Sequence, residues 1–313
     1  MMINELEALV VSLSTKVYIV VIGFEILFSF WFDRRYYTLA DTATNVYLTL
    51  LNMLLDIGMR SFVVIVLGFF YHYRFFNWEA GWTYWLILFL AEDFLFYWLH
   101  WVDHHSRLFW AVHVTHHSSA YFNLTTGFRS SVFQPVYRFI YFIPLALLGF
   151  PPLDIFLMYS VTQIYGILLH TQTVGKLNRF VEFFLVTPSH HRVHHASDIP
   201  YLDKNMGMVL IIWDRMFGTF AEEQTDKPMR YGLFQKETPK NPVSIVFHEW
   251  QSLWKDLQRP LPFATKIKYL LKPPGWSHDG STLTSKELRD QVNAPLASSD
   301  SSARRVYSLE EGE

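Results

Sequence analysis

Long stretches with very few charges constrain this chain more than any other feature of its sequence. Residues 9–32, 45–71 and 82–101 are each long enough to form a helix that crosses a hydrocarbon core of about 30 Å. Over the whole chain 51% of the residues are hydrophobic and 17% are charged, whereas soluble domains carry about 25% charged residues. A protein that is soluble throughout is therefore not expected.

A fourth apolar stretch, residues 139–169, is interrupted by Pro151 and Pro152. Proline cannot continue a helix interior, so this stretch predicts a hairpin of two helices. Each arm holds about 12–17 residues, or roughly 18–26 Å, which is short for a full span. We expect a re-entrant or tilted pair that returns to its starting side. The predicted fold is an all-α integral membrane protein with about four to five membrane-embedded helices.

The basic residues predict the orientation of these helices. Arg34 and Arg35 follow the first span, whereas the first ten residues contain Glu5 and Glu7 but no basic residue and no secretory leader. The positive-inside tendency places Arg34 and Arg35 in the cytosol. The residues after the third span then return to the cytosol and form a helical, histidine-rich cap there. The membrane would be the endoplasmic reticulum of a eukaryote or the inner or plasma membrane of a bacterium.

Most of the fourteen histidines fall into three short motifs, one HxxxH and two HxxHH, and one more stands at the end of the hairpin. Residues three and four apart share a helix face, so each motif presents its imidazoles to one point. Nine nitrogen ligands exceed the four that one zinc needs, which predicts two metal ions. Imidazole binds zinc, copper, iron and nickel alike. The histidines of the three motifs and of the hairpin end are His100, His104, His113, His116, His117, His170, His191, His194 and His195.

Several other polar residues are candidates for supporting these ligands, because metal-bound imidazoles usually donate their second N–H to a carboxylate or carbonyl. Asp93 and Tyr97 share a helical stripe with two of the histidines, and a buried acid in a membrane span is a functional candidate. The alternative is a capping or bundle-facing acid. The candidates are Glu92, Asp93, Tyr97, His105, His190 and Asn205. His190 is as good a candidate for a ligand as for a supporting residue.

The remaining composition excludes other chemistries. The chain has no cysteine, which excludes disulfides, thiolate catalysis and thiolate metal sites. Its net charge of −2 gives no indication of a nucleic-acid partner. Ordinary structural roles are expected for His72, His248 and His278, and no catalytic residue is predicted outside the metal centre.

The three histidine motifs beside several spans resemble the fatty acid hydroxylase and sterol desaturase superfamily, and most closely its alkylglycerol monooxygenase branch. The resemblance implies two iron ions on the same nine histidines, O2 as co-substrate and a lipid taken from the bilayer. It further implies hydroxylation of the ether-bearing carbon and collapse to a fatty aldehyde and a glycerol derivative, with tetrahydrobiopterin as reductant. The segments that carry it are 92–104, 110–131, 187–198 and 203–223, with 33–51 between the first two spans.

The chain departs from that branch at three positions. His105 follows the HxxxH motif where the branch has Glu, Ala120 replaces an acid, and Met206 replaces the aromatic after Asn205. The electron donor is therefore left as a pterin or a redox protein. The alternatives are hydroxylation of a fatty acyl chain, an aminolipid or a sterol, or sterol desaturation. A metal transporter or a haem-anchoring protein fits less well, because the histidines lie at span ends and haem needs only one or two of them.

The composition predicts three regions along the chain. Residues 1–235 would hold the membrane helices and the catalytic domain, and residues 236–274 a peripheral helical segment. Within that segment, residues 243–257 could form an amphipathic helix against the membrane or the cap, or an ordinary solvated helix. Residues 275–313 are rich in Ser, Gly, Asp and Glu, which predicts a disordered tail without a catalytic role.

Overall fold

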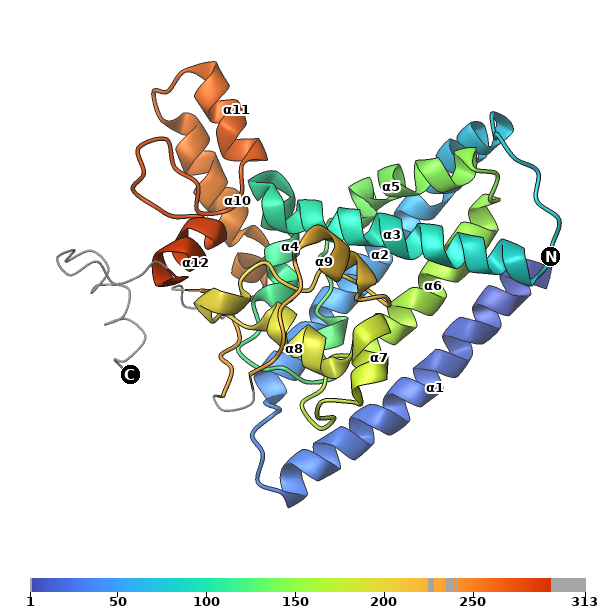
Figure 1. Ribbon diagram of the computed structural model, residues 1–313, viewed down its shortest axis with the longest axis horizontal. Helices are drawn as coiled ribbons and strands as arrows, with labels where there is room; N and C mark the ends of the chain where they lie inside the picture. Colours follow the sequence, from blue (N-terminus) through green and yellow to red (C-terminus); the bar gives the residue numbers. More distant parts are fainter. Residues whose placement is uncertain (1, 225–227, 235–238, 240, 294–313) are drawn as a thin grey trace.

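The computed structural model describes residues 2–224, 228–234, 239 and 241–293 (Figure 1). Within these residues the chain consists of helices joined by loops, with two isolated β-bridges and no strand. The prediction of an all-α chain is confirmed.

Three helices are long and apolar enough to cross a membrane: α1 (Met2–Trp31), α2 (Leu39–His72) and α3 (Trp82–His105). Large apolar side chains on α1 and α2 stay exposed, such as Phe24 at 69% and Ile65 at 71%. A helix that is apolar on all sides and yet exposed is typical of a membrane span. In contrast, α3 is more buried than α1 and α2, because α4, α5 and α6 pack against it.

The predicted hairpin consists of α5 (Pro135–Leu147) and α6 (Pro152–Leu168). The turn between them requires Gly149, whose φ is +103°. A Cβ at this position would lie only 2.2 Å from the carbonyl oxygen of Phe76. The indole Nε1 of Trp78 also donates to a carbonyl of this turn at 2.8 Å. The tip of the hairpin is thus fixed to the loop between α2 and α3.

Short helices carry the chain through the region where α3 ends (Figure 1). Ser106 is extended and separates α3 from α4, so the chain changes direction between the first two histidine motifs. The short helices are α4 (Arg107–His117), η1 (Thr126–Phe128), α7 (Arg179–Phe184), α8 (Pro188–His195), η2 (Ile199–Tyr201) and α9 (Ile212–Phe217).

Three further helices gather beyond α4, at the end of the molecule away from the N-terminus (Figure 1): α10 (Pro242–Gln258), α11 (Phe263–Leu271) and α12 (Ser285–Asn293). The predicted amphipathic helix is α10, and it packs against α4. The C-terminal helices are thus placed beside one of the helices that carry histidines.

The prediction of disorder from residue 275 onward is wrong for residues 275–293. Thr284 and Glu287 form a reciprocal cap, in which the carboxylate accepts from the Thr284 N–H at 2.8 Å and the Thr284 hydroxyl accepts from the Glu287 N–H at 3.4 Å. Leu288 is buried. One cap and one buried leucine order a short helix that composition alone does not reveal. The rest of the predicted tail, residues 294–313, lies outside the described residues.

Candidate metal centre

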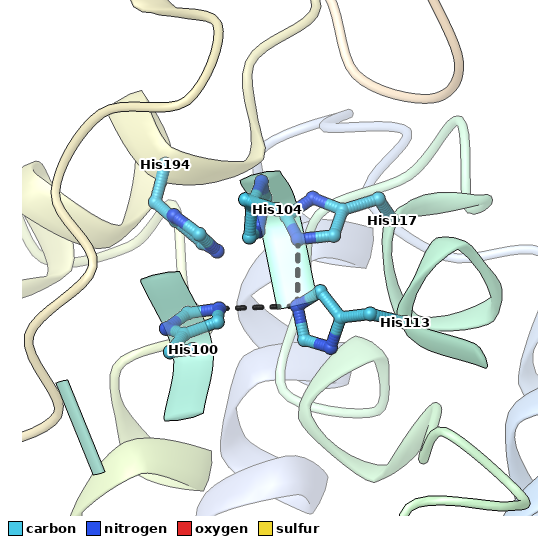
Figure 2. A group of neighbouring side chains, drawn as sticks. All are labelled: His100, His104, His113, His117 and His194. Atoms are coloured by element: carbon cyan, nitrogen blue, oxygen red, sulfur yellow. Dashed lines mark hydrogen bonds between the residues drawn. The ribbon is translucent and has the colours of Figure 1, made fainter. Parts of the chain in front are cut away.

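The structure brings all nine predicted histidines together in two adjacent clusters. The ligand atoms within each cluster lie within 4.8 Å of one another. The first cluster is His100, His104, His113, His117 and His194, and the second is His116, His170, His191 and His195. Figure 2 shows the rings of the first cluster pointing toward a common centre from separate elements.

Helical spacing distributes the ligands between the clusters. On α4, His113 and His117 are one turn apart and face the first cluster, whereas His116 faces the second. On α8, the first cluster receives His194 and the second receives its two neighbours in the motif. Each of these two helices therefore contributes ligands to both clusters.

Outer hydrogen bonds fix the orientation of the rings. In four histidines Nδ1 lies 2.8–3.0 Å from a backbone carbonyl oxygen, which can only accept, so Nδ1 carries the proton. The Nε2 atom then holds the lone pair and faces the cluster. These pairs are His100 with Met206, His116 with Arg129, His170 with Gly166, and His194 with Lys204.

The inner nitrogens are arranged as metal ligands are. The Nε2 atoms of His116 and His170 lie 3.4 Å apart, although both hold lone pairs that repel each other unless a cation lies between them. In the first cluster the Nε2 atoms of His104 and His194 are buried without a hydrogen-bond partner. Buried nitrogen lone pairs of this kind are costly when unsatisfied. The donor set of both clusters therefore fits a bound metal ion.

The histidines outside α3 are also in the protonation state that a metal requires. Burial lowers the pKa of His116 to about 4. It lowers the pKa of the other cluster histidines on α4, α8 and the hairpin end well below the ordinary value. These rings are neutral at pH 7, so their lone pairs are free to bind a metal.

Two aspartates near the clusters were missed by the sequence analysis. The Oδ1 atom of Asp203 accepts from Nδ1 of His104 at 3.1 Å. The Oδ2 atom of Asp103 lies 3.7 Å from Nδ1 of His113, and its carboxylate is held by Gln134 and Tyr137. Asp103 stands three residues after His100 on α3, so helical spacing could have revealed it. Asp203 follows a loop, and no sequence pattern places it beside His104.

Burial raises the pKa of Asp203, but the hydrogen bond from His104 and the neighbouring histidines lower it further, so its pKa lies below the ordinary value. The carboxylate is therefore charged at pH 7. A charged acceptor on Nδ1 makes Nε2 of His104 a stronger donor to a metal.

The acids predicted on α3 support the site indirectly. The carboxylate of Asp93 accepts from the backbone N–H groups of Val209 and Leu210, at 2.9 and 3.1 Å, and from the indole of Trp213 at 2.9 Å. It thereby holds the first turn of α9 and the residues just before it, and none of these three hydrogen bonds involves a histidine of the clusters. Its neighbour Glu92 is fully buried and has a 3.3 Å bond from the hydroxyl of Thr162 on α6.

The remaining supporting candidates also lie around the clusters. The hydroxyl of Tyr97 lies 3.0 Å from that of Thr219. The imidazole of His105 stacks on the indole of Trp101 with the ring centroids 4.1 Å apart. It belongs to neither cluster.

His190 is not brought into either cluster. Its Nδ1 accepts from the N–H of Thr187 and so closes the cap of α8. The amide of Asn205, which adopts a φ of 56°, donates to the carbonyls of His190 and Ala221 at 3.0 and 2.9 Å. These contacts fix α8 and the loop behind it.

Two buried charged residues connect the spans with the region of the histidine clusters. Neither was selected from the sequence. The guanidinium of Arg129 donates to Asp41 and Asn45 of α2 and to the carbonyl of Thr115 on α4. The carboxylate of Glu25 on α1 accepts from the N–H of Leu124 at 2.8 Å and from the hydroxyl of Thr171, next to a ligand of the second cluster. Both contacts connect a long helix with a loop near the histidines.

A cavity of about 650 Å³ opens onto the clusters. One side of it is lined by His104, His117, His194 and His195, and the other by residues of α10, α11 and α12. Its volume lies within the range of about 300–1,000 Å³ of small-molecule sites. A substrate bound there would lie against both metal sites.

Comparison with known proteins agrees with this geometry. Residues 85–219 match the family model "Fatty acid hydroxylase", and this range includes every histidine of both clusters. Over residues 85–219 the chain is therefore similar to the fatty acid hydroxylases. The resemblance inferred from the histidine motifs is confirmed, and α10, α11 and α12 lie beyond the matched residues.

The curated relatives point to one branch of the family. The chain is 35% identical over 277 residues to alkylglycerol monooxygenase of Homo sapiens, covering 87% of this chain and 61% of that protein. It is 36% identical over 248 residues to the Danio rerio protein of the same name, covering 78% and 54%. The chain thus spans about three-fifths or less of the length of these relatives.

A shorter similarity connects the chain to ornithine lipid hydroxylase of Rhizobium tropici, with 39% identity over 79 residues, which covers 25% of this chain and 23% of that protein. No solved structure matches the chain.

Proposed function

We propose that this protein is a di-iron monooxygenase of the membrane that cleaves glyceryl ethers. The observation that carries the proposal is the convergence of nine imidazoles in two clusters, with the ligand atoms of each cluster within 4.8 Å of one another. The similarity to alkylglycerol monooxygenases over most of the chain supports the substrate class.

The two metal sites would be held by the first and the second cluster. Bound iron would supply the activation of O2 and the oxidation of a C–H bond. The reaction takes O2, two electrons, two protons and the ether lipid, and it yields water and a lipid hydroxylated on the ether-bearing carbon. That hemiacetal then passes its hydroxyl proton to the departing ether oxygen and gives a fatty aldehyde and glycerol.

The chain's own residues position the reactants. Backbone carbonyls and Asp203 orient the rings from outside, and the cavity beside both clusters receives the lipid. We propose that the histidine clusters and the helices around them face the cytosol. The membrane is the endoplasmic reticulum in a eukaryote or the inner or plasma membrane in a bacterium.

The proposed electron donor is a tetrahydropterin, with a redox protein as the alternative. The position after the HxxxH motif holds His105, which stacks on Trp101, in place of the Glu of the related branch. Ala120 and Met206 are the other departures. A pterin would therefore have to be bound by other residues of this chain.

Hydroxylation without cleavage is the second candidate, and the similarity to ornithine lipid hydroxylase favours an aminolipid as its substrate. Hydroxylation of a fatty acyl chain or a sterol and sterol desaturation are further alternatives, because they also oxidise a lipid C–H bond.

The deciding experiment incubates the purified full chain with labelled glyceryl ether, ornithine lipid, fatty acid and sterol, each with and without tetrahydrobiopterin. Fatty aldehyde release from the ether is the expected result. Oxidation of a different lipid without aldehyde release would replace ether cleavage by the second candidate. Turnover in the absence of bound iron would contradict the di-iron proposal altogether.

A further inference from the structure

The cavity that opens onto the clusters is closed on its far side by helices that the family match does not include. The residues of α10, α11 and α12 that line it lie beyond residue 219. The histidine side of the cavity therefore lies within the residues that match the family. The opposite wall lies outside them and can differ with the lipid that is accepted.

The charged side chains of this wall compensate one another. Arg107 lies at the centre, with Nε 2.9 Å from a carboxylate oxygen of Glu249 and Nη1 2.6 Å from Asp256. Arg259 lies 3.5 Å from the second oxygen of Asp256. Arg259 also lies 3.7 Å from Asp279, so both guanidinium groups of the wall are already paired with carboxylates. A phosphate or an ammonium group entering here would have to compete with these ion pairs.

Neutral hydrogen-bonding groups of the same wall remain available. The Nδ1 atom of His248 lies 3.0 Å from the carbonyl oxygen of Ile245, so it carries the ring proton. The Nε2 atom of His248 is buried and has no partner among the described residues. The hydroxyl oxygen of Ser252 accepts from Arg107 at 3.0 Å, which leaves its own proton free to donate. The wall therefore offers one acceptor and one donor, spaced one turn apart on α10.

Apolar side chains also line the cavity beside the metal ligands. The indole of Trp110 lies next to the rings of His104 and His117, with centroid distances of 5.2 and 5.6 Å, and Val114 and Leu202 line the cavity beside it. The cavity thus combines polar groups on α10 with apolar side chains beside the histidines. This combination suits a lipid that carries a polar headgroup on an apolar chain.

We propose that the α10 wall of this cavity is a binding site for a neutral, hydroxyl-bearing lipid headgroup, with His248 and Ser252 as its hydrogen-bonding residues. A glyceryl group has this chemistry, because its hydroxyls both donate and accept and carry no charge. The proposal rests on the proposed function, which identifies the ether-bearing carbon as the one that reacts. It adds that selection of the headgroup is made by the C-terminal helices rather than by the histidine domain.

Equilibrium binding to the purified full chain tests the site independently of turnover. Three labelled ethers with the same alkyl chain serve as probes: 1-O-hexadecylglycerol, its 3-phosphate and hexadecyl methyl ether. We expect the uncharged diol to bind at least tenfold more tightly than the other two. Equal or tighter binding of the phosphate would overturn the proposal.

Variants of α10 identify the residues. His248→Ala and Ser252→Ala are each expected to weaken diol binding about three- to tenfold, the loss of one hydrogen bond, and to leave methyl ether binding unchanged. His248→Gln keeps an acceptor and should restore part of the affinity. Gln251→Ala, at an exposed position of the same helix, is the matched control. Unchanged diol binding in both alanine variants would overturn the assignment.

Turnover separates this proposal from the proposed function. Selective diol binding without aldehyde release would contradict ether cleavage and keep the headgroup site. Aldehyde release with the same KM in wild type and both alanine variants would keep ether cleavage and remove the site.

Discussion

The Nδ1 atom of His104 lies 3.1 Å from Oδ1 of Asp203, across the junction between α3 and the loop that follows η2. Asp203 adopts a φ of 52°, a left-handed conformation that few residues other than glycine, asparagine and aspartate tolerate. The backbone is therefore held in an uncommon conformation at the point where the carboxylate meets a predicted metal ligand. Asp203 orients His104 and strengthens its Nε2 as a donor.

Replacing Asp203 by alanine should therefore reduce metal binding. Loss of such an outer partner typically lowers metal affinity about 10- to 100-fold. Metal content of the purified protein, measured during titration with a chelator, checks this. Asp198→Ala is the control, because Asp198 belongs to the same segment but pairs with Arg230 instead of a histidine. Equal chelator sensitivity of both variants would show that Asp203 does not act on the metal.

His194 and His190 lie four residues apart on α8 and have different predicted roles. His194→Ala should lose metal from the first cluster and abolish turnover, because one of its five ligands is removed. His190→Gln should keep both metals, since glutamine is a common acceptor at this position of a helix cap. Measuring the metal content and the turnover of both variants tests these two roles. Full iron content and activity in His194→Ala would refute the assigned ligand set.

Gly127 is expected to be indispensable for the second cluster alone. A Cβ at this position would lie 2.9 Å from Nδ1 of His170 and 2.9 Å from the carbonyl oxygen of Ile167. Gly127→Ala should displace His170 and lower the metal content from about two ions to one. Gly68→Ala, where nothing lies within 4 Å, should retain both. An alanine variant with full metal content would mean that the His170 loop adapts.

The neighbouring acids of α3 should differ sharply in their effect on stability. Asp93→Asn removes a charged acceptor shared by three N–H groups, and it should destabilise the fold by about 1–3 kcal/mol. Glu92→Gln should change stability little, because one oxygen of Glu92 has no hydrogen-bond partner among the described residues. Thermal unfolding in detergent compares the two. A larger loss for Glu92→Gln would contradict this account of the pair.

Removing the metals should make the protein sensitive to mild acid. Folding lowers the pKa of the buried histidines outside α3, to about 4 for His116, below the unfolded value of about 6.5. Between these values the unfolded chain binds more protons than the folded one, so stability decreases as the pH falls from about 6.5 toward 4. The Tm of chelated protein should fall over this range. A Tm that is constant with pH would show that the imidazoles are not buried.

The sequence predicted the parts of the structure that follow from local periodicity. Apolar length identified α1, α2 and α3, and Pro151 and Pro152 identified the hairpin. Helical spacing within the motifs selected eight of the nine histidines that the structure gathers, because imidazoles three and four residues apart share a face. His170 stands outside the motifs and was selected through the family resemblance.

Contacts between distant segments were beyond that reasoning. Asp203 meets His104 across 99 residues of chain, and Arg107 meets Glu249 across 142. Neither contact leaves a local pattern. Asp93 was selected for its place on the histidine face of α3, yet its carboxylate binds the residues just before α9. Residue type and helix face identify a buried acid, whereas its partners depend on tertiary packing.

The eight-residue helix α8 completes both clusters, and this has a consequence for biosynthesis. While the protein is being translated, the imidazoles of α3 and α4 are present long before their partners on α8 emerge from the ribosome. Neither cluster can present its full set of imidazoles until residue 195 has been synthesised and packed. One late segment of the chain thus completes both clusters, so a metal ion that requires the full ligand set of either one would bind late in maturation.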